Sequence, residues 1–129
     1  MIQWSRWTIL NLKNYEEVVI FEIGKTYQID QEKNPYEEYK LAGSLSNVSN
    51  DNLLELKQRL NDALNHSGFE ISFIKKENPQ EIFHPNGYFE IIFKNKTIGF
   101  LAQVHPRITD NLGSSKRLSV FEINIKNLI

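Results

Sequence analysis

Residues 88–104 read YFEIIFKNKTIGFLAQV, and this stretch decides the fold. Its two halves, Tyr88–Phe93 and Thr97–Val104, are rich in the aromatic and β-branched residues that favour extended strands. The short polar segment KNK (94–96) that joins them is typical of a tight hairpin. We therefore expect two neighbouring antiparallel strands here.

Four further segments show the same composition, with polar and apolar side chains that alternate in a period of two. Val18–Tyr27 is the clearest, because Val19, Phe21 and Ile23 would lie on one face of the strand and Glu22 on the other. Together with the hairpin, these segments predict six strands. The remaining three are Tyr39–Leu45, Phe69–Lys75 and Leu118–Ile125.

One amphipathic helix is expected after Asp51, a plausible N-cap, because leucines recur at helical spacing between Asn52 and Gly68. A shorter helix is expected over Pro106–Gly113, since proline suits a first turn and glycine the position after the last. Residues 1–13 could hold the end of another. Strands in series without regular β-α-β alternation predict an α+β domain, an antiparallel sheet flanked by helices.

Composition limits the function further. The 129 residues are enough for one domain, 1–129, and the absence of cysteine rules out disulfides and thiolate metal sites. A formal net charge of -1 argues against a domain whose main task is to grip phosphates. Because no apolar run is long enough to span a membrane and no signal peptide is recognisable, we expect a cytoplasmic or organelle-stromal protein without a membrane partner.

His84 and His105 are the first candidates for chemistry, and each stands directly before a proline. Two imidazoles could ligate a metal or exchange protons, but no third ligand follows at a recognisable spacing. The structural interpretation is that each histidine anchors a turn where a strand ends, because a residue before proline is driven to extended or turn conformations. His66, at the end of the predicted helix, also has a structural explanation.

Three mid-strand carboxylates, Glu22, Glu90 and Glu122, could line one face of the sheet if their strands were adjacent. Paired carboxylates can act as general acid and base, although such residues more often form the wet face of a half-covered sheet. No nucleophile elbow, Walker loop, Rossmann fingerprint or HExxH motif is present. Basic pairs at strand ends are typical of solubilising edges, and the aromatic residues are expected in the core.

Four segments in order resemble the core of a phenylalanyl-tRNA synthetase beta subunit. They are VVIFEIGKTY (18–27), LELKQRLNDAL (54–64), FHPNGYFEIIFKNKTIGFLAQVHPRI (83–108) and LSVFEINIKNL (118–128). The most specific part is a His-Pro, a strand, a polar turn, a strand with Ile-Gly, and a second His-Pro. The positions that match family motifs, to which we assign structural roles, are Phe21, Glu22, Gly24, Lys57, His84, Pro85, Gly99, His105, Pro106, Phe121 and Glu122.

The chain also departs from the family pattern. Gln58 follows Lys57 where the family has glycine, Asn86-Gly87 follow the first His-Pro, and Ala102 replaces a glycine before the second. The loop after Leu45 looks shortened. These differences are typical of a divergent member.

The resemblance implies a fold similar to the class II synthetase core, in a copy that is catalytically inactive. Class II catalysis needs an arginine on one strand for the ATP phosphate and a glycine-rich, arginine-ending strand, and neither 18–27 nor 118–128 supplies them. The negative charges of Glu22 and Glu122 would moreover repel a polyphosphate. We therefore expect no catalytic, cofactor-binding or metal-binding residue here, with ATP and magnesium belonging to the holoenzyme.

The leading hypothesis is a scaffold for the catalytic alpha subunit during ATP-dependent charging of tRNA(Phe) with phenylalanine, with tRNA bound through other domains. The chain would then be a fragment of a longer beta subunit. One alternative is a free-standing synthetase-like paralogue that binds a protein or small molecule. Another is an independent enzyme that uses His84, His105 and the glutamates.

Overall fold

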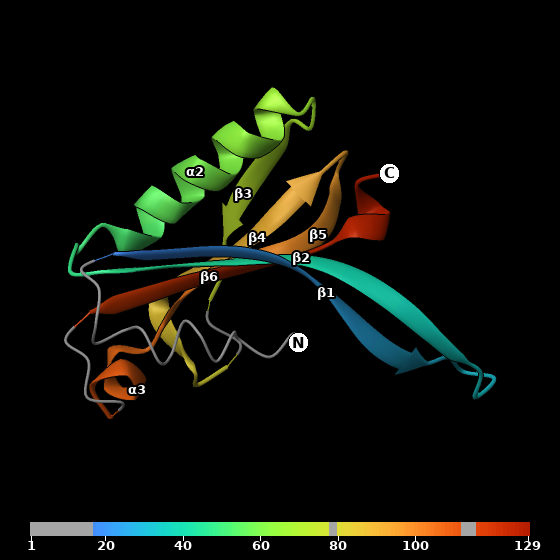
Figure 1. Cartoon of the computed structure of the whole chain (residues 1–129), viewed down its shortest axis with the longest axis horizontal. Helices are drawn as coiled ribbons and strands as arrows, with labels where there is room; N and C mark the ends of the chain where they lie inside the picture. The colour runs from blue at the N-terminus through green and yellow to red at the C-terminus, as the bar shows by residue number, and fades with distance from the viewer. Residues whose placement is uncertain (1–16, 78–79, 112–115) are drawn as a thin grey trace.

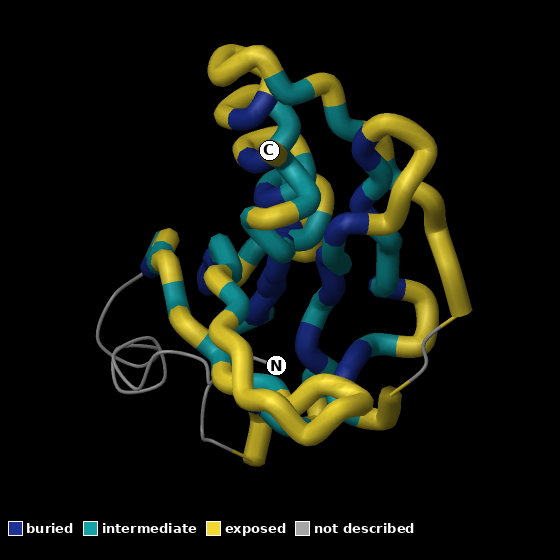
Figure 2. Tube along the Cα trace, turned by 90° about the vertical axis from the view of Figure 1, so that its right-hand side faces the viewer, coloured by how far each residue is buried: buried dark blue, intermediate teal, exposed yellow. Residues whose placement is uncertain are grey.

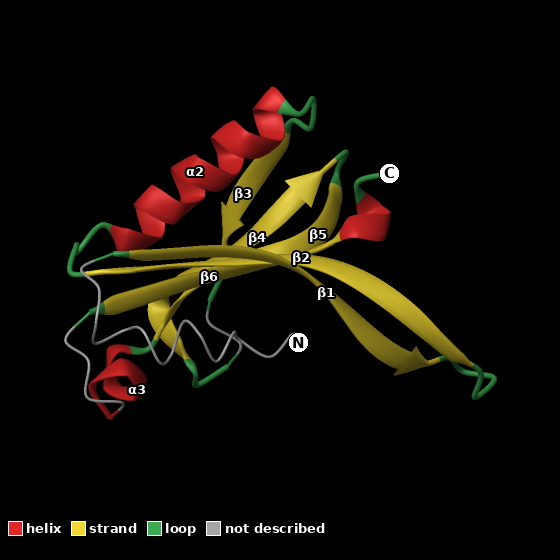
Figure 3. Ribbon diagram, in the orientation of Figure 1, coloured by secondary structure: helices red, strands yellow, loops and turns green. Residues whose placement is uncertain are grey.

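The structure is a computed structural model that describes residues 17–77, 80–111 and 116–129. Its strands form one antiparallel sheet in the order β1-β2-β6-β5-β4-β3. The helices α2 and α3 lie on opposite faces of this sheet (Figure 1, Figure 3), so the expected α+β fold is confirmed. The elements are β1 (Val18–Ile29), β2 (Pro35–Asn47), α2 (Asn52–His66), β3 (Ile71–Lys75), β4 (Phe83–Phe93), β5 (Lys96–Val104), α3 (Pro106–Asn111), β6 (Arg117–Asn124) and the 3-10 turn η1 (Ile125–Asn127).

All six expected strands form, but two of them begin several residues earlier than predicted. β2 starts at Pro35 rather than Tyr39, because its polar first residues pair with the far end of β1. β4 starts at Phe83 rather than Tyr88, since Phe83 pairs with Val104 across an irregularity in the ladder. In both cases pairing with a neighbour extends a strand through residues whose local composition favours a turn. The helix expected in residues 1–13 and the end of the one at 106–113 lie outside the described residues.

The β4–β5 connection is tighter than the sequence indicated. Lys96 already pairs with Phe93, so the turn consists of Lys94 and Asn95. Both have positive φ, 51° and 64°, as a type I′ hairpin turn requires. The turn twists in the same sense as the strands it joins, and the expected hairpin is confirmed.

Helix α2 begins and ends at the predicted positions, although its N-cap side chain makes no capping bond. Asp51 occupies the N-cap position without a side-chain capping hydrogen bond. At the other end, Gly68 has φ of 89° and the amide of Phe69 donates to the carbonyl of Leu64 at 2.8 Å. This left-handed glycine is the helix stop that the sequence predicted.

The core lies on both faces of the sheet. On one face, the buried leucines of α2 (Leu56, Leu60 and Leu64) pack on Phe121 and on Ile123 of β6. On the opposite face, a second cluster joins β4, β5 and β6 and receives Ile108 from α3. Its buried members are Phe83, Ala102, Val104, Leu118 and Val120. Figure 2 shows the buried positions gathered inside, while the projecting end of β1 and β2 is exposed.

The last strand in the sequence, β6, is the central strand in space and is buried along residues 118–123. Its two neighbours approach it through glycines. Gly43 of β2 faces Phe121, and a Cβ atom there would overlap the Phe121 ring, 2.7 Å from Cζ. Gly99 of β5 lies so close to β6 that a Cβ atom would collide with the main-chain carbonyl of Glu122. Both glycines therefore make room for β6.

We expect alanine at these two positions to destabilise the fold in different ways. Gly99→Ala should lower the free energy of unfolding by about 3 kcal/mol or more, because main chain cannot move aside. Gly43→Ala should lower it by about 1–3 kcal/mol, and Phe121→Leu should partly relieve the loss with a coupling of about 1 kcal/mol. Urea unfolding followed by circular dichroism measures each variant. A Gly99→Ala protein as stable as the wild type would contradict the close approach.

Candidate functional site

The three predicted glutamates lie in one cross-strand row on the α3 face of the sheet. Glu22 pairs with Ala42, Ala42 with Glu122, Glu122 with Phe100, and Phe100 with Glu90. Residues directly opposite in antiparallel strands point to the same face, so the row alternates carboxylate and apolar side chains. Neighbouring glutamates are two strands apart, about 10 Å along the sheet. At that spacing they do not form a directly bonded acid and base pair.

The expectation that the glutamates form a wet face is wrong for Glu122. Its side chain is 4% exposed, and its Oε1 lies 3.4 Å from Nζ of Lys40 on β2. Lys40 stands one step along the strand from the row, on the same face. Glu90, at the other end of the row, accepts a hydrogen bond from Thr97 at 3.3 Å. The ammonium group of Lys40 thus compensates the charge of the buried Glu122 carboxylate.

Sequence reasoning missed a polar cluster where α2 begins. Asn52 is fully buried and donates to the Leu45 carbonyl at 3.1 Å and to Oδ1 of Asn47 at 2.9 Å. Ser119 of β6 donates to the Asn52 side-chain oxygen. These bonds tie α2 to β2 and β6. The signal was present, since asparagine at the first helical position is a poor helix former, but one of its partners, Ser119, is 67 residues away in sequence.

The two His-Pro motifs come together. The rings of His84 and His105 stack with centroids 6.1 Å apart and planes at 25°. Each Nδ1 accepts a backbone N–H two residues on, from Asn86 at 3.0 Å and from Arg107 at 3.1 Å. The prediction that each histidine anchors a turn where a strand ends is confirmed for His105, which follows β5, and is wrong for His84, which lies near the start of β4.

These hydrogen bonds also limit the chemistry of the histidines. A neutral imidazole that accepts at Nδ1 carries its proton at Nε2, so both rings present N–H donors. Beside them, a cavity of about 330 Å³ is lined by Glu81, Phe83, Pro85, His105 and Arg107. Among the described residues, no group of three or more His, Cys, Asp or Glu side chains could hold a metal ion. The pair lies at the junction of β5 and α3, where Pro106 opens the helix.

The other motif positions lie in the scaffold. Lys57 of α2 places Nζ 5.3 Å from the Phe73 ring centre and 4.8 Å from that of Phe89, so it covers the sheet through cation–π contacts. Gly24 continues β1 and pairs with Lys40. Phe21 and Phe121 contact each other across Gly43 with ring centres 5.7 Å apart. Arg117 begins β6 opposite Asn47, at the end of the strand away from Glu122.

A surface whose position the sequence did not predict is the outer part of β1 and β2, which we call the arm (residues 21–29 and 35–41). Its far end extends past the rest of the sheet (Figure 1). On its α2 face, Ile23, Tyr27 and Ile29 are 69%, 73% and 72% exposed, and Phe21 and Tyr39 are exposed as well. The expectation that the aromatics are core residues is wrong here, because no described helix reaches this far. A row of apolar side chains is left open.

On the α2 face of the arm, the charges of Lys25 and Glu37 compensate each other. Lys25 lies 3.4 Å from Glu37 and 5.5 Å from the centre of the Tyr39 ring. The nearby Glu37 carboxylate raises the pKa of Lys25, so the ammonium stays charged at neutral pH. The arm face is thus apolar with a compensated charge pair at its middle. Such a surface suits a protein partner better than a nucleic acid.

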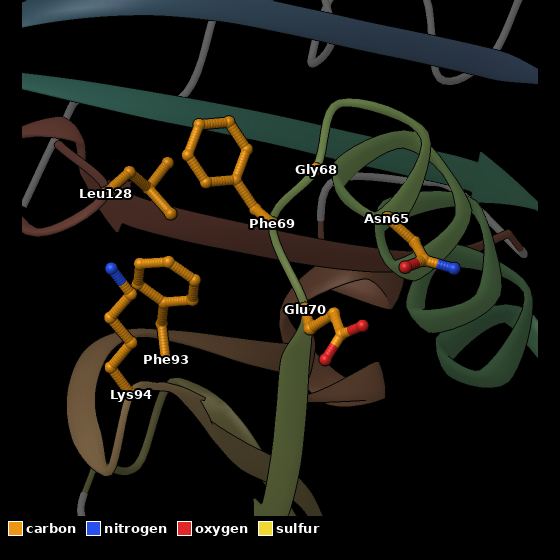
Figure 4. Close-up of a pocket in the computed structure, with 7 residues that line it drawn as sticks. All are labelled: Asn65, Gly68, Phe69, Glu70, Phe93, Lys94 and Leu128. Carbon is orange, nitrogen blue, oxygen red and sulfur yellow. The ribbon is translucent and has the colours of Figure 1, made fainter.

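A cavity of about 520 Å³ lies at the end of α2 (Figure 4). It is lined by Asn65, Gly68, Phe69, Glu70, Phe93, Lys94 and Leu128. The rings of Phe69 and Phe93 meet edge to face with centres 5.8 Å apart. Its polar rim carries one cation and one carboxylate, so it has no strong charge preference.

Comparison with known proteins places the sequence in a family. Residues 10–125 match the family described as phenylalanyl tRNA synthetase beta chain CLM domain. The phenylalanine–tRNA ligase beta subunit of Thermococcus kodakarensis is 32% identical over 106 residues, 81% of this chain and 18% of that protein. That of Thermococcus sibiricus is 29% identical over 137 residues, 96% of this chain and 24% of that protein. The beta subunit of Clostridium tetani is 24% identical over 113 residues, which are 88% of this chain and 14% of that protein. The chain spans about a fifth of the length of these relatives.

No helix within the described residues is both long and apolar enough to cross a membrane.

The Lys40–Glu122 pair should couple strongly to stability. Replacing Lys40 by Met leaves a carboxylate buried without this cation and should lower the free energy of unfolding by about 2 kcal/mol or more. Glu122→Gln in the same chain should recover much of the loss, giving a coupling of about 1–3 kcal/mol in a double-mutant cycle. Chemical denaturation of the four proteins measures it. Additive losses would show that the two charges do not interact.

At alkaline pH, the ionisation of Tyr88 should lower the free energy of unfolding. Burial, and secondly the charge of Glu90, raises the pKa of Tyr88 above that of a free tyrosine. The folded state therefore holds this proton more tightly than the unfolded state. The stability that this proton contributes is fully present below the pKa of Tyr88 in the unfolded chain, about 10. It is lost as the pH rises through the higher pKa of Tyr88 in the folded protein. Tyr88→Phe should flatten the fall in unfolding free energy above pH ~10; an unchanged fall would contradict the assignment.

Proposed function

The chain belongs to the phenylalanyl-tRNA synthetase beta chain CLM-domain family, and we propose that it is the non-catalytic core of a beta subunit. In this proposal the domain scaffolds the catalytic alpha subunit, which uses ATP and magnesium to attach phenylalanine to tRNA(Phe). The tRNA is bound through other domains. That the chain is part of a longer beta subunit stays a prediction, as does its cytoplasmic location, and nothing in the comparisons favours an organelle.

The observation that carries the proposal is the open apolar face of the arm. Exposed aliphatic and aromatic side chains side by side on two paired strands are typical of a surface that another protein covers. The relatives are named as beta subunits, and a subunit requires such a surface. The charge pair Lys25–Glu37 adds a polar element that can orient the partner.

The row of glutamates supports the non-catalytic part of the proposal. In a class II-like core one face of the sheet would receive ATP, and by the resemblance Glu22 and Glu122 lie on that face. Here that face carries Glu22, Glu90 and Glu122, and the nearby cation Lys40 is already paired with Glu122. The face therefore offers a polyphosphate no free positive charge on these strands. This also weighs against an independent enzyme built on the glutamates.

The second candidate function is a free-standing module that binds a small molecule. The feature that favours it is the cavity of about 520 Å³ beside α2 (Figure 4). Its mixed lining, with Lys94 and Glu70 on opposite sides of two phenylalanine rings, would suit a small zwitterionic compound. Complex formation with an alpha subunit separates the two functions, since the module needs no such partner.

We expect the chain to form a complex with a phenylalanyl-tRNA synthetase alpha subunit that size exclusion and isothermal titration calorimetry can detect. Tyr27→Thr/Tyr39→Thr should weaken this complex about tenfold or more, because it removes two exposed aromatic contacts from the arm and keeps β-forming residues. The matched control is Val48→Thr, which changes a side chain of similar exposure outside the arm. A folded wild-type chain that fails to bind any alpha subunit would refute the proposal.

A further inference from the structure

The outer edge of β1 is a second unpartnered surface of the arm, distinct from its apolar face. In the described part of the sheet, β1 and β3 are the two edge strands. β1 is 12 residues long, and its pairing with β2 runs from Val18 to Ile29 without a register shift. Each alternate residue of an edge strand directs its N–H and C=O outward, so β1 presents a long row of backbone donors and acceptors.

The two edge strands differ in length and in the residues that protect an edge from further pairing. β3 has five residues, ends at Lys75 and is followed by Lys76, so the edge is protected by short length and charge. β1 contains no proline and no bulge, and its one lysine, Lys25, is engaged with Glu37 on the neighbouring strand. An edge of this length without protection is one that another strand covers.

We propose that the outer edge of β1 pairs antiparallel with β1 of a second copy of this chain, about a two-fold axis that passes through Gly24. The proposal goes beyond the scaffolding of the alpha subunit, because it uses the backbone edge of the arm rather than its apolar face. Two sheets would then join into one, with their α2 faces on the same side.

This register fits the side chains of β1 to themselves. Phe21 lies opposite Tyr27 of the second copy, and Val19 opposite Ile29 of the second copy, so aromatic meets aromatic and aliphatic meets aliphatic. Lys25 lies opposite Ile23 of the second copy. On the other face, Glu22 lies opposite Thr26 and Ile20 opposite Gln28 of the second copy. Each of these pairs occurs twice.

Nearby registers are less favourable. An axis through Glu22 places two glutamates opposite each other, and an axis through Lys25 places two lysines opposite each other. An axis through Ile23 avoids both, but brings the two copies of Glu22 to adjacent diagonal positions and separates Phe21 from Tyr27. The charges of β1 thus favour the axis through Gly24. The experiment must distinguish it from the axis through Ile23.

The test uses two variants at one position, Ile23→Lys and Ile23→Glu, in the whole 129-residue chain. Both replace the same exposed apolar side chain with a charged one, so a contact through the apolar face weakens equally in both. Only the Gly24 register sets residue 23 against Lys25 of the second copy. Ile23→Lys then creates two like-charge pairs and Ile23→Glu two opposite-charge pairs.

We expect sedimentation velocity to show a dimer of the wild-type chain, with a Kd about tenfold weaker or more for Ile23→Lys than for Ile23→Glu. The difference should shrink at high salt, because exposed charges are screened. Val48→Lys, a similarly exposed position away from β1, should dimerise like the wild type. Circular dichroism confirms that each variant is folded.

Two results would overturn the inference. One is a wild-type chain that remains monomeric up to about 1 mM. The other is a loss of dimer, relative to the wild type, in Ile23→Glu as well as in Ile23→Lys, which would indicate the Ile23 axis, where residue 23 faces its own copy, or association through the apolar face. Binding of the alpha subunit is measured separately with the Tyr27→Thr/Tyr39→Thr variant, so either proposal can fail without the other.

Discussion

The fold depends on the insertion of β6 between β2 and β5. Without this strand, the described sheet would separate into the β1–β2 hairpin and the β3–β4–β5 sheet, each held by pairing between neighbours in sequence. β6 joins them across a separation of about 80 residues on the β2 side, and it is the strand that is buried on both faces. Because its neighbours contribute Gly43 and Gly99, the main chains approach where side chains would otherwise keep them apart.

The parts of the fold that follow from local composition could be predicted from the sequence. The β4–β5 hairpin, the leucine face of α2 and the helix stop at Gly68 each depend on residues within a few positions of one another. The length of β2 could not, because Pro35–Glu38 reads as a turn until β1 pairs with it. Local signals thus indicate which elements form, while pairing determines how far they extend.

The candidate site shows the same division. The sequence identified Glu22, Glu90 and Glu122 as residues of one possible face, and the structure places them in one row. It could not reveal that Lys40 neutralises Glu122, because Lys40 reaches it only through the non-local pairing of β2 with β6. The stacking of His84 on His105 likewise depends on how the β4–β5 ladder aligns its two ends. Residue type suggested which side chains could take part in chemistry, but their actual partners depend on strand pairing that is not local in sequence.

The arm follows from the same constraint. β6 has eight residues and β2 has 13, so the β1–β2 hairpin necessarily continues past the last residue that β6 can pair. Beyond Lys40, β2 has only β1 beside it, and α2 covers the strands on the other side of β6. A two-stranded ribbon is marginal on its own in water, yet the arm keeps apolar residues on one face and compensates its charges. Such a ribbon gains stability when other chains cover it, and this is why we regard the arm as the surface through which the domain acts.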